Sequence, residues 1–182
     1  MSSSSILVIS DSHDNIAALI TVLKWAYDAN FDAAVFLGDG CEDLNLASAR
    51  TGFALPWYAV RGNGDFTSPV PHNITLEISA RKLFLSHGNR YNVREGCKTI
   101  AAAARNVGAE AALFGHTHIP YCATVDGTFL LNPGSIGRPR SDAGRTFAVL
   151  ECPDSGPLAA RFFRLAARGG ENVVEQLKLQ RG

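Results

Sequence analysis

The sequence lacks an excess of charge of either sign. Its 182 residues include 17 basic and 17 acidic side chains, so the formal net charge at pH 7 is zero. Nucleic-acid-binding proteins usually carry a basic face, and proteins that bind anionic membranes carry a polybasic cluster. Neither feature is present in this sequence, so general nucleic-acid binding is not expected. A nucleotide nevertheless stays open as a substrate.

Long apolar runs and paired cysteines are also missing. The first ten residues, MSSSSILVIS, have no basic segment and too short an apolar run for a signal peptide. No run reaches the roughly 20 apolar residues that span a bilayer. Cys41, Cys97, Cys122 and Cys152 are widely spread and form no C-x-x-C motif, a pattern typical of free thiols in a reducing compartment. We therefore expect a cytoplasmic protein without membrane association.

No repeat or low-complexity linker divides the chain. A chain of 182 residues can bury a sizeable core without disulfides. We expect one domain over residues 1–182, with residues 1–5 disordered and residues 166–182 forming a C-terminal tail.

Short apolar runs that end in glycine-rich turns dominate the first half of the chain. Residues 6–10 are continuously apolar, as in a strand buried on both faces. Residues 16–27 have apolar side chains at helical spacing, with Asp14 or Asn15 as the helix cap. The segments AAVFLGDG and WYAVRGNGD each predict another strand followed by a turn. This order predicts a βαβ unit.

The second half of the chain is mainly antiparallel in pattern. Residues 74–78 and the segment KLFLSHGN predict a hairpin, CKTIAAAARNVG predicts a helix, and AALFGHTH predicts a further strand. A second hairpin is expected around Asp126-Gly127, and a last strand pair around PDSGP. The fold class is therefore α/β with mixed sheets, in a layered sandwich.

Histidine, aspartate and asparagine follow the predicted strands. Ligands bind at the carboxyl ends of parallel strands, where such residues would meet. Each residue alone is more typical of a turn, a cap or a hydrogen-bonded polar group. Their joint occurrence favours one site of nitrogen and oxygen ligands without cysteine. The residues are Asp11, His13, Asp39, Asn63, His87, His116 and His118.

These residues form an ordered series of motifs: D-x-H (11–13), GD (38–39), GN (62–63), HG (87–88) and GHTH (115–118). The series resembles that of the calcineurin-like metallophosphoesterases, and most closely their small single-domain bacterial and archaeal phosphodiesterases. The segment LNPGSIGRPR at 131–140 is similar too, so the resemblance spans residues 6 to about 150. It implies a four-layer αββα sandwich.

The resemblance implies two divalent transition-metal ions, with manganese as the expected metal and iron, nickel or zinc as alternatives. It places Asp11, His13, Asp39 and His118 on one ion. It places Asp39, Asn63, His87 and His116 on the other, so that Asp39 bridges the two. Asp39, Asn63 and His116 are also its implied catalytic residues.

The implied reaction is hydrolysis of a phosphate ester, most simply a diester, by in-line attack of a hydroxide that bridges the ions. Two divalent ions outweigh the carboxylates of Asp11 and Asp39, so the centre attracts phosphate. The expected substrate is a small phosphate ester, with a nucleotide as one option. Phosphomonoesterase or nucleotide pyrophosphatase activity is an alternative, and so is a non-catalytic scaffold such as the retromer subunit of this fold. A homo-oligomer stays open.

Two departures from the wider family bear on the substrate. Many members have a histidine after GN that is proposed to protonate the leaving group, but this chain has Gly64. The GD-x-x-D-R-G motif of protein phosphatases reads GDGCEDL here, with Glu42 in place of the second aspartate. Both argue against a protein phosphatase. They favour good leaving groups, or help from water, from Asp65 or from the substrate itself.

Further residues are candidates for the surroundings of the substrate. Asp65, Arg61 and Asn89 are predicted near the substrate or behind the ligands, and Arg90 and Arg94 flank the same loops. Tyr121 and residues 136–140 are candidates for the cleft wall. His72 is expected to have no catalytic part, and Cys41 is expected to pack in the core.

Overall fold

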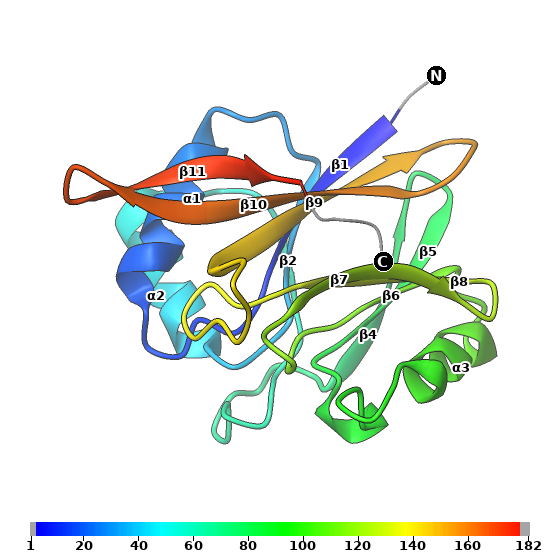
Figure 1. Cartoon of the computed structure of the whole chain (residues 1–182). Helices are drawn as coiled ribbons and strands as arrows, with labels where there is room; N and C mark the ends of the chain where they lie inside the picture. Colours follow the sequence, from blue (N-terminus) through cyan, green and yellow to red (C-terminus); the bar gives the residue numbers. More distant parts are fainter. Residues whose placement is uncertain (1–2, 179–182) are drawn as a thin grey trace.

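The computed structural model describes residues 3–178, which form two mixed β-sheets packed face to face (Figure 1). One sheet has the order β11-β10-β9-β1-β2-β3, and the other has the order β4-β5-β6-β8-β7. In chain order the elements are β1 (Ser3–Ile9), α1 (Ile16–Tyr27), β2 (Ala33–Phe36), α2 (Cys41–Thr51), β3 (Trp57–Ala59), β4 (Asn73–Ile78), β5 (Arg81–Ser86), the 3-10 turn η1 (Asn89–Tyr91), α3 (Lys98–Asn106), β6 (Ala111–Leu113), β7 (Pro120–Val125), β8 (Thr128–Pro133), β9 (Arg145–Pro153), β10 (Ala159–Arg168) and β11 (Glu171–Leu177).

The central strands are buried on both faces, which explains their continuous apolar runs. In β1, Leu7 and Ile9 pack in one core with α1 and α2, whereas Ile6 and Val8 pack between the two sheets. A third cluster packs α3 against the outer face of the second sheet. Figure 1 shows α1 and α2 on one side of the molecule and α3 on the other. The four-layer αββα sandwich is therefore confirmed.

The expected strand pairings are also confirmed. Strands β1, β2 and β3 are parallel, as are β5, β6 and β8, while β4–β5 and β7–β8 are antiparallel hairpins. Asp126 and Gly127 form the β7–β8 turn with φ of 48° and 80°, as a two-residue hairpin turn requires. Asn15 caps α1 by accepting a hydrogen bond from the Ala18 N–H at 3.1 Å.

The structure corrects the sequence analysis in three places. Helix α2 was not predicted. Residues 3–5, expected to be disordered, pair with β9 as part of β1. The expected C-terminal tail contains the end of β10 and all of β11, which pairs with β10 and contributes Val174 to the core. Residues 1–2 and 179–182 lie outside the described residues. Within the described chain, no helix has the length and apolar character to cross a membrane.

Candidate metal centre

Six of the seven predicted ligands form one cluster, in the loops that follow β1, β2, β5 and β6. These strands come from both sheets, so the cluster lies where the two sheets meet. The six are Asp11, His13, Asp39, His87, His116 and His118. The seventh, Asn63, is an exposed residue of the loop after β3. Its neighbour Gly64 donates a backbone hydrogen bond to Asp39 Oδ1 at 2.6 Å, which brings that loop to the cluster.

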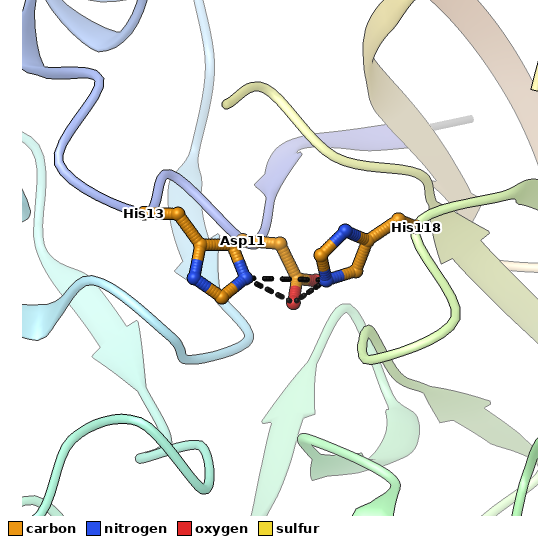
Figure 2. A group of neighbouring side chains, drawn as sticks. All are labelled: Asp11, His13 and His118. Atoms are coloured by element: carbon orange, nitrogen blue, oxygen red, sulfur yellow. Dashed lines mark hydrogen bonds and ion pairs between the residues drawn. The ribbon is translucent and has the colours of Figure 1, made fainter. Parts of the chain in front are cut away.

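The first half of the cluster is formed by Asp11, His13 and His118 (Figure 2). His118 Nε2 lies 3.1 Å from Asp11 Oδ1, and His13 Nε2 lies 3.7 Å from the same oxygen. The two Nε2 atoms are 3.2 Å apart. Figure 2 shows the rings of His13 and His118 on either side of the Asp11 carboxylate, each with a nitrogen facing it.

The second half is formed by Asp39, His87 and His116. His87 Nε2 lies 3.4 Å from Asp39 Oδ2 and 3.2 Å from His116 Nδ1. The two halves join at Asp39 Oδ2, which is also 3.6 Å from His13 Nε2. Asp39 therefore has histidine nitrogens of both halves around one carboxylate oxygen.

Backbone carbonyls fix the orientation of two histidine rings. His87 Nδ1 lies 2.7 Å from the Leu37 carbonyl oxygen, and His118 Nδ1 lies 2.5 Å from the Arg138 carbonyl oxygen. A carbonyl oxygen accepts only from an N–H, so the Nδ1 atoms carry a proton and the Nε2 atoms face the cluster. Histidines that bind metals are commonly held in this way. Burial lowers the pKa of His87, but Asp39, Asp11 and the Leu37 carbonyl outweigh burial and the net shift is upward.

Histidine nitrogens and carboxylate oxygens converge in the cluster, as the ligands of a metal ion do. Asp11 Oδ1 is fully buried, and the Nε2 atoms of His118 and His13 lie beside it. A buried carboxylate oxygen is costly unless a positive partner compensates it. The imidazole and carboxylate donors around it suit first-row divalent metals. The residues present therefore fit the predicted metal ions.

The charge states in the cluster agree with ligand chemistry. Burial opposes ionisation, but neighbouring histidines hold the pKa of Asp11 and of Asp39 below the usual value, with the Gly64 N–H adding to the effect at Asp39. Burial, together with the nearby His87 and Arg94, lowers the pKa of His116 to about 4. His116 is thus neutral at pH 7 and has a lone pair to offer.

The backbone is strained at the cluster. Asp11, His13, Asp39, His116 and His118 have φ between 43° and 67°, a region that residues other than glycine seldom occupy. Such strain persists only where the surrounding structure enforces it, and it concentrates at functional sites.

The 131–140 segment supplies part of that enforcement. Ser135 Oγ donates to the Asp11 carbonyl oxygen at 2.8 Å, and Asn132 Nδ2 donates to the Gly115 carbonyl oxygen at 2.7 Å. The Arg138 carbonyl in the same segment holds His118. The sequence analysis noted this segment but gave no role to Asn132 or Ser135.

Asp65 connects the loop after β2 and the loop after β3 with the start of α2. Its carboxylate accepts hydrogen bonds from the backbone N–H groups of Asp39, Gly40, Cys41 and Gly62 at 2.7–2.9 Å. Burial raises its pKa, but these N–H groups outweigh burial and the net shift is downward. Helix α2 starts after Gly40, which has no side chain to cap its N-terminus. Asp65 caps this end from another loop instead. This is a structural role behind the ligands, one of the two positions that the sequence analysis predicted for Asp65.

The remaining candidates have structural contacts or lie apart. Arg61 donates to His72 Nε2 and to the Ser68 carbonyl oxygen, so its guanidinium braces the loop after β3. Asn89 begins the 3-10 turn η1 beyond His87. The Cys41 thiol is buried in the core, and burial together with Asp65 raises its pKa to about 12.

Two hollows flank the ligand loops. A polar cleft of about 630 Å³ reaches His13 and Asp39, and its walls include Glu42, Phe66 and Arg138. A smaller, apolar hollow of about 380 Å³ lies beside the GHTH loop. A small phosphate ester could therefore reach the cluster from solvent.

The fold and the donor cluster are those expected of the calcineurin-like phosphoesterases, and comparison with known proteins agrees. The model of the calcineurin-like phosphoesterase superfamily domain matches residues 5–155. The chain belongs to this superfamily.

Individual relatives are similar over most of the chain. The probable metallophosphoesterase YsnB of Bacillus subtilis is 27% identical over 96% of this chain and 99% of its own. The phosphodiesterase YfcE of Escherichia coli is 26% identical over 78% of this chain and 84% of its own. A crystal structure of Vps29 from Entamoeba histolytica has a TM-score of 0.75 at 23% identity, covering 97% of this chain and 99% of that one. This last likeness shows the fold alone.

Proposed function

We propose that this protein is a phosphodiesterase whose centre holds two divalent transition-metal ions, with manganese as the expected metal. The observation that carries the proposal is the convergence of histidine nitrogens on the buried carboxylates of Asp11 and Asp39. Membership of the phosphoesterase superfamily and similarity to a named phosphodiesterase support it.

The proposed ligands divide into two sets that share Asp39. Asp11, His13 and His118 complete one set, and Asn63, His87 and His116 complete the other. When bound, the ions would polarise the phosphate and supply a nucleophile from water at neutral pH. Asp39, Asn63 and His116 are the proposed catalytic residues, by their match to the motifs of the family. A cytoplasmic location is part of the proposal, in line with four free cysteines.

The chain's own residues would position the substrate. His13, which is partly exposed in the polar cleft, and Arg138, at the edge of that cleft, face the side from which a phosphate would enter. Gly64 has no proton to donate to the leaving group, and all four close contacts of Asp65 are backbone N–H groups. The proposed substrates therefore have leaving groups that depart without a protein acid.

The test compares two substrates with the same leaving group. Protein freed of metal by chelation and reloaded with Mn²⁺ should hydrolyse bis-p-nitrophenyl phosphate with a higher kcat/KM than p-nitrophenyl phosphate. A preference for the monoester would replace the proposal with a phosphomonoesterase. Single turnover in ¹⁸O-labelled water should put the label into the phosphate product, because no covalent enzyme intermediate is proposed.

A non-catalytic scaffold is the second candidate, and the likeness to the Vps29 fold is the observation that favours it. A scaffold should show no stoichiometric metal and no hydrolysis of either ester after reloading. The competent donor at each ligand position supports the enzyme instead.

A further inference from the structure

The smaller hollow lies beside the GHTH loop and is mostly apolar. Its volume is about 380 Å³, and Val93, Phe114, Ile119 and Tyr121 contribute to its walls. Val93 and Phe114 are almost fully buried, whereas 45% of the Ile119 surface is exposed. The Phe114 and Tyr121 rings are 6.3 Å apart at 57°. A hollow of this volume with apolar and aromatic walls can bind one aromatic ring system of a ligand.

Two arginines of this hollow are linked to the candidate metal ligands. Arg94 Nη2 lies 3.4 Å from the His116 carbonyl oxygen, and the Arg140 backbone N–H donates to the His118 carbonyl oxygen at 3.2 Å. The hollow and the centre therefore share one loop. Within the described chain, neither guanidinium forms an ion pair with a carboxylate, so both are available to an anion.

The two hollows differ in charge, which determines the group that each accepts. The polar cleft has the carboxylates of Asp14 and Glu42 in its walls, and Arg138 beside them is paired with Asp14. The apolar hollow offers aromatic walls and two positive charges instead. Guanidinium groups pair well with carboxylates and phosphates.

We propose that the hollow beside the GHTH loop binds an aromatic, negatively charged ester group of the substrate, with Phe114, Ile119 and Tyr121 around the ring and Arg94 and Arg140 at its anionic substituent. This inference rests on the proposed phosphodiesterase function and names the substrate class of the same site. A base or other ring joined to a second acidic group satisfies this description.

The experiment uses three diesters that share the p-nitrophenolate leaving group and differ in the other ester group: methyl, phenyl and 4-carboxyphenyl. The Mn²⁺-loaded protein should have the highest kcat/KM for the carboxyphenyl ester and the lowest for the methyl ester. Tyr121→Ala should lower the phenyl-to-methyl ratio of kcat/KM about tenfold, because a buried aromatic contact is lost. Arg140→Ala should lower the carboxyphenyl-to-phenyl ratio at least about fivefold.

Matched control variants are available on other surfaces. Tyr27 is exposed on α1, and Arg161 pairs with Glu151 on the first sheet. Tyr27→Ala and Arg161→Ala should leave both ratios unchanged. If the wild-type protein hydrolyses the diesters but Tyr121→Ala and Arg140→Ala keep its ratios, the inference is wrong and the proposed function stands.

A binding measurement decides the inference if no diester is hydrolysed. Chelated protein is titrated calorimetrically with 4-carboxyphenyl phosphate. Arg140→Ala should weaken binding at least about fivefold relative to wild type and to Arg161→Ala. Equal binding by all three proteins, or no binding by the wild type, would overturn the inference.

Discussion

At the scale of single residues, Asp39 is the side chain that joins the two halves of the candidate centre. One of its carboxylate oxygens lies 3.4 Å from His87 Nε2 and 3.6 Å from His13 Nε2. Asp39→Ala should therefore lower activity more than about a hundredfold, since loss of a second-shell group alone costs 10–100-fold, and should reduce bound metal. Hydrolysis of bis-p-nitrophenyl phosphate and elemental analysis check both. A variant with near-normal turnover would refute the assignment.

His116 and His118 are expected to serve different ions, although only Thr117 separates them. His118 faces Asp11 and His13, whereas His116 faces His87. His118→Ala should therefore weaken mainly the first of two binding steps in a Mn²⁺ titration, and His116→Ala mainly the second. Loss of the same step in both variants would show that the division of ligands is mistaken.

Gly115 allows the GHTH loop to approach β1 closely. A Cβ at this position would lie 2.1 Å from Ser10 Oγ and 2.6 Å from Asp11 Oδ2. These two atoms are joined by a hydrogen bond, which Ser10 Oγ donates at 2.5 Å. Gly115→Ala should therefore displace the Asp11 carboxylate, weaken Mn²⁺ binding about tenfold or more and lower the unfolding free energy by about 1–3 kcal/mol.

The double variant Ser10→Ala/Gly115→Ala provides the control for this steric account. It removes the closest clashing atom, so it should recover part of the stability that Gly115→Ala loses in denaturant titrations. A double variant less stable than the sum of the two single changes would mean that the clash is elsewhere.

Residue type and position were enough to predict which side chains would gather, because the six clustered residues lie in the loops that follow strands. The groups that hold these donors were harder to predict. Asp65 acts through backbone N–H groups of distant residues, and Ser135 and Asn132 bind backbone carbonyls. The spacing of side chains along the sequence does not indicate which distant backbone groups a side chain will bind. The role of Asn63 stays an expectation from the sequence, since its exposed side chain forms no hydrogen bond with the residues that the structure describes.

At the scale of secondary structure, α2 depends on a residue outside itself. Its N-terminal N–H groups are bound by Asp65 from the loop after β3. Asp65→Ala should cost about 2–3 kcal/mol of unfolding free energy and weaken metal binding, because Asp39 and Gly62 lose the same anchor. Thermal or denaturant unfolding measures the first effect and Mn²⁺ titration the second.

Asp32 offers a matched control for Asp65. Its exposed carboxylate accepts one backbone hydrogen bond, from Ser5 at 2.7 Å. Asp32→Ala should cost less than about 1 kcal/mol, the usual net value of one hydrogen bond, and should leave Mn²⁺ binding unchanged. Equal losses of stability in the two variants would contradict the capping role of Asp65.

The same dependence explains why the sequence predicted some elements and not others. Helix α1 carries its own cap, Asn15, and a clear apolar face, so it was recognised. Helix α2 follows Gly40 and is capped by Asp65 from another loop, so no residue beside its start indicated a helix. The residues of strand β11 are exposed or partly buried, and the strand gains its hydrogen bonds from β10. Its formation therefore depends on a pairing that the segment itself does not encode.

At the scale of the whole molecule, the two sheets bring the donors together. Parallel strands of each sheet end at the same place, so the loops after β1 and β2 meet those after β5 and β6. The end of β8 and the segment after it then bind the backbone of Gly115 and of Asp11, one loop from each sheet. The fold thus holds the strained ligand loops in position, which favours tight metal binding.

The central claim is that this sandwich holds two ions through Asp39, and electron paramagnetic resonance during Mn²⁺ titration of the chelated protein tests it most directly. The free-Mn²⁺ signal should stay low until two equivalents per chain have been added, and the bound ions should give the spectrum of a magnetically coupled pair. Asp39→Ala should abolish the coupled spectrum. A wild-type protein that binds no stoichiometric Mn²⁺, or binds one isolated ion, would contradict the account.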